Sequence, residues 1–284
     1  MSYYDEHGLA IRVAYLAVAG LCRLVDGMTR LRPRPPQAVV LCYHGVTAAQ
    51  RERFAWQMRQ LAGRAVDLAD GEHQARCDRR RPGVCVTFDD AFANLLDNAL
   101  PTLRQLNIPA IIFAVPASLG TRPAWEIPPE HPEAAEPVMT PEQLAAARDV
   151  ASCRIGSHTM THIAIGRSRP EVVQWECEQS KAHLEKLLGA PVDDLALPYG
   201  SYNDRAMQIA RAAGYRRIYT LDPCLHPLGQ DGPVGRFSMT PDAWRIEFRL
   251  TCAGAYRWLL PWRRFLRRIR PQQQSATSTE PSLA

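Results

Sequence analysis

The sequence lacks any Cys-x-x-Cys pair, although it contains eight cysteines. Several of them, such as Cys42 and Cys85, lie inside apolar runs, which favours buried reduced thiols over a disulfide framework or a cysteine-based zinc site. It also lacks an apolar run of membrane-spanning length, because Arg12 and Arg23 closely bracket the apolar residues 13–21. No clear secretory signal and no internal repeat are found. We therefore expect a cytoplasmic protein that is neither a disulfide scaffold nor a repeat array.

The charge is modest but unevenly placed. A net charge of +5 on 284 residues, with 46% hydrophobic and 22% charged residues, is ordinary for a globular protein with one barrel-sized domain. Residues 257–270, however, contain six arginines and no acid, mixed with Trp, Phe, Leu and Ile. This mixture suits an interfacial helix on an anionic membrane surface, here the inner face, although a solvated tail or a helix packed on the barrel remains an alternative. No nucleic-acid motif accompanies the charge, so nucleic acid is not an expected partner.

Strand and helix patterns alternate through residues 38–250, which predicts α/β architecture with parallel strands. We expect a (β/α) barrel whose catalytic face lies at the carboxyl ends of the strands. The predicted strands are 38–43, 84–88, 108–115, 153–157, 195–197 and 217–221, and the predicted helices are 8–30, 50–63, 93–106, 170–188 and 203–213.

Three regions are expected. Residues 1–36 would form an amphipathic helix, with Leu9, Val13, Leu16, Ala17 and Leu21 on one face, and a Pro/Arg linker. Residues 37–250 would form the catalytic domain. Residues 251–284 would form a basic aromatic segment and a disordered tail. Within the domain, residues 120–139 contain five prolines and predict a long irregular loop that is functional or disordered.

Two groups of polar residues follow predicted strands and carry metal-binding chemistry. Asp89 and Asp90 end one buried strand, and His158 and His162 follow another. Two neutral imidazoles and one carboxylate make a three-ligand set that leaves coordination positions open, as catalytic zinc requires. Each group also has a simpler interpretation: the aspartates could cap a helix, and the histidines could be surface residues.

These residues carry a resemblance. Thr87-Phe88-Asp89-Asp90-Ala91, His158-Thr159-x-x-His162 and Leu197-Pro198-Tyr199-Gly200 occur in the order and strand-end contexts of the polysaccharide deacetylase (NodB-homology) family, carbohydrate esterase family four. The chain resembles this family from Tyr43-His44 to about Thr220. The resemblance implies a distorted seven-stranded (β/α) barrel and a hydrolase of carbon–nitrogen bonds other than peptide bonds.

The resemblance also implies roles for individual residues. Asp89 matches the catalytic base, and Asp90, His158 and His162 match the ligands of a divalent metal, with zinc expected. Tyr199 matches the residue whose backbone N–H helps to hold the oxyanion, and the neighbouring Pro198 would contact substrate. In the implied mechanism, a metal-bound water deprotonated by the base attacks an acetyl carbonyl. The implied substrate is an acetylated glycan or lipid-linked sugar, most simply an N-acetylhexosamine.

The sequence departs from the family pattern at three places. Ala91 stands where the family usually has glycine, and Ala196 stands where it often has an arginine that orients the base. Arg236 is a candidate replacement partner for Asp89 and a candidate substrate-binding residue. The late Leu-His motif that supplies the general acid has no clean match, so His226 and His44 are both candidates. These departures keep two alternatives open: a catalytically silent glycan-binding scaffold, and a deacylase of a non-sugar amide.

Overall fold

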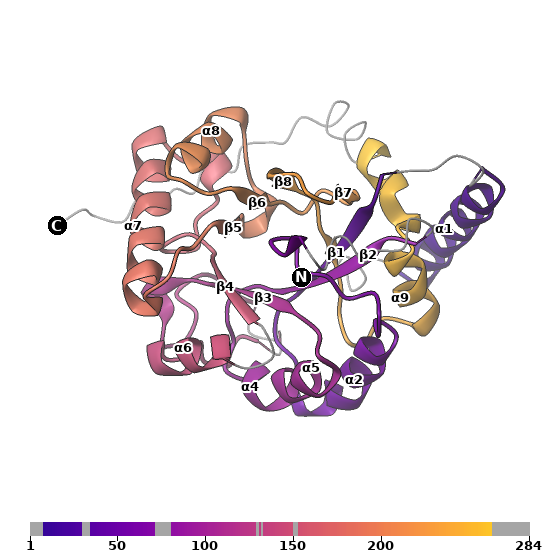
Figure 1. Cartoon of the computed structure of the whole chain (residues 1–284), viewed down its shortest axis with the longest axis horizontal. Helices are drawn as coiled ribbons and strands as arrows, with labels where there is room; N and C mark the ends of the chain where they lie inside the picture. The colour runs from indigo at the N-terminus through magenta and orange to yellow at the C-terminus, as the bar shows by residue number, and fades with distance from the viewer. Residues whose placement is uncertain are drawn as a thin grey trace.

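In the computed structural model, the described residues are 8–29, 35–71, 81–128, 131, 133–149 and 153–262. Six strands follow one another around a central sheet and pair in parallel with their neighbours in chain order (Figure 1). They are β1 (Gln37–Tyr43), β2 (Gly83–Phe88), β3 (Ala110–Ala114), β4 (Cys153–Ser157), β5 (Asp194–Ala196) and β6 (Arg217–Tyr219). Most residues of these strands are buried, as expected when helices cover a parallel sheet.

Three short strands complete the sheet, and they are the part of it that the sequence did not predict. They are β7 (His226–Pro227), β8 (Gly232–Val234) and β9 (Phe237–Ser238). β8 pairs in parallel with β6, β7 pairs antiparallel with the start of β1, and β9 pairs in parallel with its end. Among the described residues, no pairing joins β8 to β7. The sheet is therefore a nearly closed (β/α) barrel of the predicted type, with more strands than the expected seven.

Helices surround the sheet on its outside (Figure 1). They are α1 (Leu9–Thr29), α2 (Arg51–Arg59), α4 (Leu95–Asn98), α5 (Leu100–Leu106), α6 (Pro141–Asp149), α7 (Pro170–Leu188), α8 (Asp204–Ala212) and α9 (Arg245–Cys252). Five single turns of 3-10 helix supplement them: η1 (Ala48–Gln50), η2 (Pro116–Ser118), η3 (Ile165–Arg167), η4 (Pro198–Gly200) and η5 (Ala255–Trp258). None of the described helices is both long and apolar enough to cross a membrane.

Local sequence signals explain several helix boundaries. α6 begins with a capping box, in which Gln143 N donates to Thr140 Oγ1 (3.2 Å) and Thr140 N donates to the Gln143 side chain (2.9 Å). α7 begins at Pro170 and ends at Gly189, whose φ of 60° is left-handed and costs glycine little. The predicted helix 93–106 is instead two helices, because Pro101 has no N–H to donate to the preceding turn.

Two apolar clusters hold the barrel together. The larger lies between the sheet and the helices, and the smaller fills the barrel interior with residues such as Val40, Ile111 and Tyr219. At the amino end of the strands the interior also holds a buried ion cluster, in which Asp194 accepts from Arg154 and Arg217. Packing and ion pairs therefore occupy the barrel below its carboxyl end, where the polar candidates lie.

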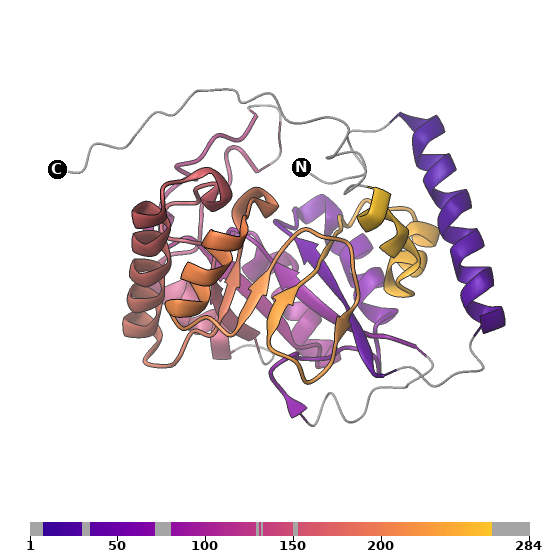
Figure 2. The same cartoon turned by 90° about the horizontal axis from the view of Figure 1, so that it is seen from above.

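The first and last described elements, α1 and η5, lie together on one side of the barrel. α1 stands beside α9 and η5 at the edge of the molecule (Figure 2). Tyr256 and Leu259 are buried, and Trp258 meets Tyr15 of α1 edge to face at 5.4 Å. The described part of the basic aromatic segment, up to Trp262, is therefore packed on the barrel, which was one of the alternatives expected for it. Most of the expected Pro/Arg linker, residues 30–34, and the expected tail from residue 263 lie outside the described residues.

Candidate metal centre

The two aspartates lie in a tight turn that follows β2. Asp89 N donates to Tyr43 O at 2.8 Å, which ties the turn to the end of β1. Asp90 and Ala91 both have left-handed backbone conformations, with φ of 68° and 51°. This conformation explains why glycine would suit position 91, since a left-handed alanine is strained. Both carboxyl groups are buried, so the turn holds two acids together away from water.

The first histidine is fixed at the end of β4. His158 N donates to Ala114 O at 2.8 Å, and the His158 Nδ1 lies 2.9 Å from Ala196 O. Because a carbonyl oxygen can only accept, this contact assigns the proton to Nδ1 and leaves Nε2 with a lone pair. The family's arginine position, Ala196, therefore contributes a backbone carbonyl that orients a predicted metal ligand.

The second histidine lies in the loop after β4. His162 has a left-handed φ of 64°, and its Nδ1 lies 3.1 Å from the hydroxyl of Tyr199. The buried carboxylate of Glu176, on α7, accepts from the N–H groups of Met160 (2.7 Å) and Thr161 (2.9 Å). Glu176 thus holds the loop between the two histidines in place, a role that no signal in the sequence pointed to.

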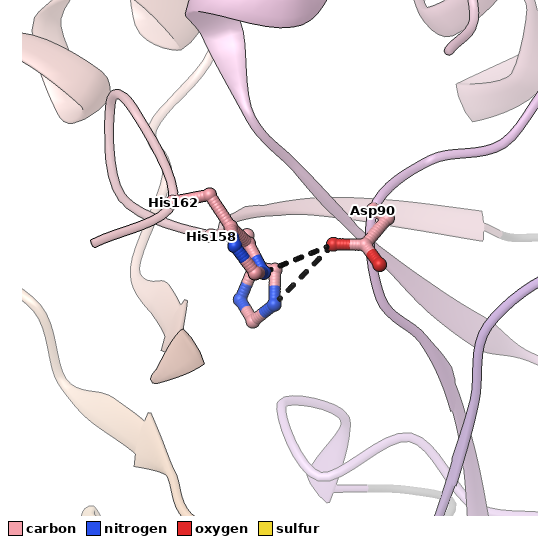
Figure 3. A group of neighbouring side chains, drawn as sticks. All are labelled: Asp90, His158 and His162. Atoms are coloured by element: carbon pink, nitrogen blue, oxygen red, sulfur yellow. Dashed lines mark ion pairs between the residues drawn. The ribbon is translucent and has the colours of Figure 1, made fainter. Parts of the chain in front are cut away.

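The two imidazoles and Asp90 converge on one point (Figure 3). Asp90 Oδ1 lies 3.6 Å from His158 Nε2 and 3.4 Å from His162 Nε2, and one ligand atom from each residue lies within 4.8 Å of the others. Among the described residues, this buried Asp90 oxygen has no hydrogen-bond partner. A buried carboxylate oxygen without a donor is costly unless a cation satisfies it. The donor set therefore fits a divalent metal, and its two nitrogens and one oxygen suit zinc.

The protonation states also suit a metal. Burial lowers the pKa of His158 to about 4 and, together with the nearby His158, lowers the pKa of His162 to about 2. Both imidazoles are therefore neutral near pH 7, as ligands must be. Burial, followed by the neighbouring Asp89, raises the pKa of Asp90 well above its usual value. A bound cation would offset both effects by favouring the carboxylate form.

Asp89 has a different partner, which comes from the segment between β8 and β9. Both terminal nitrogens of the Arg236 guanidinium donate to the Asp89 carboxylate, Nη1 to Oδ1 at 2.6 Å and Nη2 to Oδ2 at 2.9 Å. Burial alone would raise the pKa of Asp89, but Arg236 outweighs it, so the pKa lies below its usual value. Asp89 is therefore an ionised acceptor beside the three candidate ligands, and its Oδ2 lies 3.7 Å from His158 Nε2.

The placement of Arg236 depends on the preceding residue. A Cβ at position 235 would lie 2.2 Å from the sulfur of Cys224 and 2.4 Å from Asp222 O. Only glycine, which has no Cβ, therefore fits at this position. Arg236 itself is 1% exposed, and it also donates from Nη1 to Thr87 Oγ1 (3.3 Å). Its guanidinium is thus committed to the barrel interior, which fits the predicted partnership with Asp89 better than direct contact with substrate.

The two candidate general acids lie at opposite ends of the barrel. His44 directly follows β1, at the same strand end as Asp89, and is half-buried. His226 is in β7 and pairs with Ala38 at the start of β1, and its Nε2 lies 3.1 Å from Gln230 O. Five residues of β1 separate Ala38 from the catalytic end, a rise of about 16 Å at roughly 3.3 Å per residue. This position does not fit the role of general acid that was predicted for His226.

The Pro198-Tyr199-Gly200 turn lies beside the ligands, as its strand-end position predicted. Tyr199 has a left-handed φ of 58°, and the N–H groups of Gly200 and Ser201 donate within the turn at 3.0 Å. No hydrogen bond joins the Tyr199 N–H to another described residue. Pro198 is buried at the first position of the turn, so it shapes the site but presents little surface to a substrate.

The proline-rich loop supplies residues that sequence reasoning missed. The ring of Trp125 stacks on the imidazole of His162, with centroids 4.2 Å apart and planes at 26°. Glu133 accepts from Gly45 N at 2.7 Å, next to His44. Described residues of this loop therefore contact a candidate metal ligand and the residue that follows His44. A lone tryptophan among prolines was the only available signal for it.

The fold and the site together define a class: a (β/α) barrel with an Asp-His-His set at the carboxyl ends of its strands. A family model for polysaccharide deacetylases matches residues 77–218, half of the chain. The protein therefore belongs to the polysaccharide deacetylase family, as its motifs predicted.

Individual relatives agree with this assignment. YxkH of Bacillus subtilis (strain 168), an inferred polysaccharide deacetylase, is 23% identical over 202 residues; the match covers 67% of this chain and 66% of YxkH, just under two thirds. The structure of IcaB from Ammonifex degensii is similar at 26% identity and a TM-score of 0.63, covering 78% of this chain and 99% of that one. The Streptococcus pyogenes deacetylase PplD, solved with acetate, shares the fold at 19% identity and a TM-score of 0.61, with coverages of 78% and 99%.

Proposed function

We propose that the protein removes acetyl groups from a carbohydrate, and that N-deacetylation of an N-acetylhexosamine in a glycan or lipid-linked sugar is its reaction. The observation that carries the proposal is that the two adjacent aspartates have different surroundings. Asp90 faces the two imidazoles with an oxygen that lacks a donor among the described residues, whereas Asp89 is ionised and held by Arg236. One carboxylate is thus available to a metal and the other to a proton.

The metal in this proposal is zinc, held by Asp90, His158 and His162. When bound, it supplies Lewis acidity toward the acetyl carbonyl and lowers the pKa of water to about 7. Asp89 then accepts the proton of the attacking water, and Arg236 keeps that carboxylate oriented and ionised. The Tyr199 N–H, in its left-handed turn, donates to the oxyanion, and a donor of this kind contributes about 10²–10³ in rate.

The general acid in this proposal is His44. It lies at the same strand end as Asp89, and Glu133 holds the adjacent Gly45. Burial lowers the pKa of His44, so its protonated imidazole is a stronger acid than that of an exposed histidine, and this protonated form would donate to the leaving amine. His44→Ala should therefore lose acetate release far more on substrates with a poor leaving amine than on an activated acetyl ester. An equal loss on both would contradict the assignment.

The substrate is tested by acetate release from N-acetylglucosamine oligomers and from small acetamides, with wild type and Asp89→Asn. The proposal expects release from the oligomers that is absent in Asp89→Asn, although metal content is equal. Faster release from small acetamides would favour a non-sugar deacylase. No release from any acetylated glycan by metal-loaded wild type would favour the silent scaffold. Contact with an anionic membrane, also expected from the basic ends, is a separate proposal that concerns α1.

A further inference from the structure

The orientation of α1 is the reverse of that of an ordinary surface helix. Its charged side chains face the protein: Arg12 pairs with the buried Glu247 of α9, and Asp26 pairs with Arg257 at 2.5 Å. Tyr15 and the fully buried Ala19 lie on the same inward side. In most surface helices the apolar stripe packs on the core and the charges face water. Here the ion pairs fix the helix so that its apolar side points outward.

The outward face of α1 contains no polar side chain. Every exposed position from Leu9 to Val25 is Leu, Ile, Val or Ala. Of the twelve large hydrophobic residues that are exposed in the described part of the chain, seven lie on this helix: Leu9, Ile11, Val13, Val18, Leu21, Leu24 and Val25. Single exposed apolar residues are scattered over the surface of most proteins, but a contiguous group of them marks an interaction surface. The helix has 21 residues, which gives an apolar strip about 30 Å long.

A basic cavity borders this face. Arg23 of α1, Arg64, Arg81 and Arg249 of α9 line a cavity of about 230 Å³, and none of the described residues in its wall is acidic. Arg64 is anchored by hydrogen bonds to Pro82 O (2.9 Å) and Cys252 O (2.8 Å). Four guanidinium groups around one cavity match a phosphate, whose oxygens they can bind in pairs.

We propose that the outward face of α1 docks on an anionic membrane surface, with the arginine cavity accepting a lipid phosphate. The apolar strip would lie in the interface parallel to the bilayer, and the guanidinium groups would meet the headgroups beside it. Trp262, 45% exposed, follows η5 on the same side, and the sequence continues with five arginines and no acid between residues 263 and 270. The basic aromatic composition and the apolar strip therefore favour the same partner.

A second copy of the chain is the less favoured occupant. A two-fold interface pairs each surface patch with itself. Pairing α1 with α1 would bring two arginine-lined cavities of the same charge to one interface. An anionic headgroup layer complements that charge.

Docking on α1 also sets the orientation of the barrel. Arg12 contacts the start of α9, and Arg23 shares the cavity with residues near its end, so the two helices run side by side. The cavity lies near the amino end of β2, whereas Asp89 and Asp90 follow its carboxyl end. The barrel axis would thus lie along the bilayer, and the barrel end that holds the metal centre would face neither toward the bilayer nor directly away from it. This inference does not depend on the proposed deacetylation.

The test is flotation of the full-length protein with phosphatidylcholine vesicles, with and without phosphatidylglycerol. We expect binding that requires phosphatidylglycerol and weakens with salt. Leu21→Glu/Leu24→Glu should lower vesicle affinity at least about tenfold, because two apolar anchors become charges. Arg81→Glu/Arg249→Glu should lower it by about fivefold or more for each arginine on anionic vesicles.

The matched control is Trp175→Glu, an exposed tryptophan on α7, and α7 lies across the barrel from α1 (Figure 1). It should leave vesicle binding unchanged, and circular dichroism should show all variants folded, since every changed side chain is exposed. Leu9→Glu/Val13→Glu provides an independent variant at the other end of α1. Absence of binding by wild type, or equal binding by the α1 variants, would overturn the proposal. So would a dimer in sedimentation velocity that both α1 variants disperse without any vesicle binding.

Discussion

Replacement of Arg236 by methionine tests how the barrel keeps its predicted base ionised. The arginine is buried and grips Asp89 at 2.6 and 2.9 Å, so Arg236→Met leaves a buried carboxylate without its cation. Breaking one side of a buried ion pair costs about 3–5 kcal/mol of folding free energy. Methionine retains most of the volume, so loss of the charge accounts for most of the expected change.

The activity of Arg236→Met should be lost in a pH-dependent manner. Burial raises the pKa of Asp89 once Arg236 no longer opposes it, so the base becomes protonated toward neutral pH. The acid limb of kcat/KM for acetate release should move up by at least about one pH unit. At a pH below the shifted limb, the loss should approach the factor of about 10²–10⁴ that a general base supplies.

The stability difference between wild type and Arg236→Met should also depend on pH. In wild type the pKa of Asp89 is below its unfolded value, so its contribution persists until the pH falls below that value. In the variant the raised pKa means that protonation relieves the penalty as the pH falls. The difference in unfolding free energy should therefore be larger at pH 8 than at pH 5.

Two further variants separate charge from geometry in this prediction. Arg236→Lys keeps the positive charge but cannot form both hydrogen bonds to the carboxylate. Its unfolding free energy and the pH of its acid limb should both lie between those of wild type and Arg236→Met. Asp89→Asn/Arg236→Met should be more stable than Arg236→Met alone, because no buried charge remains. If Arg236→Met shows a wild-type acid limb and wild-type stability, the reasoning on the pair is refuted.

Three more predictions concern the support of the histidine loop, a candidate metal ligand and the ion cluster at the amino end of the barrel. Glu176→Gln should weaken zinc affinity about 10–100-fold, because an amide cannot accept every bond that holds the histidine loop; an unchanged affinity in a competition titration would argue against this. In metal-free protein, burial lowers the pKa of His158 to about 4, so its stabilising contribution is complete above pH 6.5. That contribution, on the order of 3 kcal/mol, should be lost as the pH falls toward 4 and should be missing from the urea unfolding of His158→Gln. Asp194→Ala should cost about 3–5 kcal/mol, since the buried Arg217 keeps only Asp231 at 3.5 Å, whereas Arg154 remains paired with Asp67; a change below 1 kcal/mol in urea unfolding would contradict it.

The strand-end residues were predictable because short-range signals mark them. A buried apolar run that ends in polar residues places those residues at the carboxyl edge of a parallel sheet, which brought Asp89, Asp90, His158 and the Tyr199 turn to one face. The main helices were equally visible, since α7 has Pro170 at its start and Gly189 at its end. These features depend on residues that are close in sequence.

The remaining features depend on contacts between distant residues. His226 has the letters of a family motif, but pairing with Ala38 fixes it at the amino end of the barrel, and nothing near it in the sequence encodes that pairing. Trp125 contacts a residue 37 positions away and Glu176 contacts residues 15 and 16 positions away, and no local pattern marks Glu176 as a support of the histidine loop. Periodicity likewise grouped Leu9 and Leu21 on one face of α1, but only the ion pairs of the opposite face turn that face outward.

The central claim is that Asp90 binds metal while Asp89 handles the proton. Metal analysis of purified protein, combined with acetate release from N-acetylglucosamine oligomers, measures both roles in the same samples. We predict that wild type and Asp89→Asn each retain one metal ion per chain and that only wild type releases acetate. Asp90→Asn and His158→Gln should lose the metal. Retention of metal by Asp90→Asn, or its loss from Asp89→Asn with the fold intact, would contradict the claim.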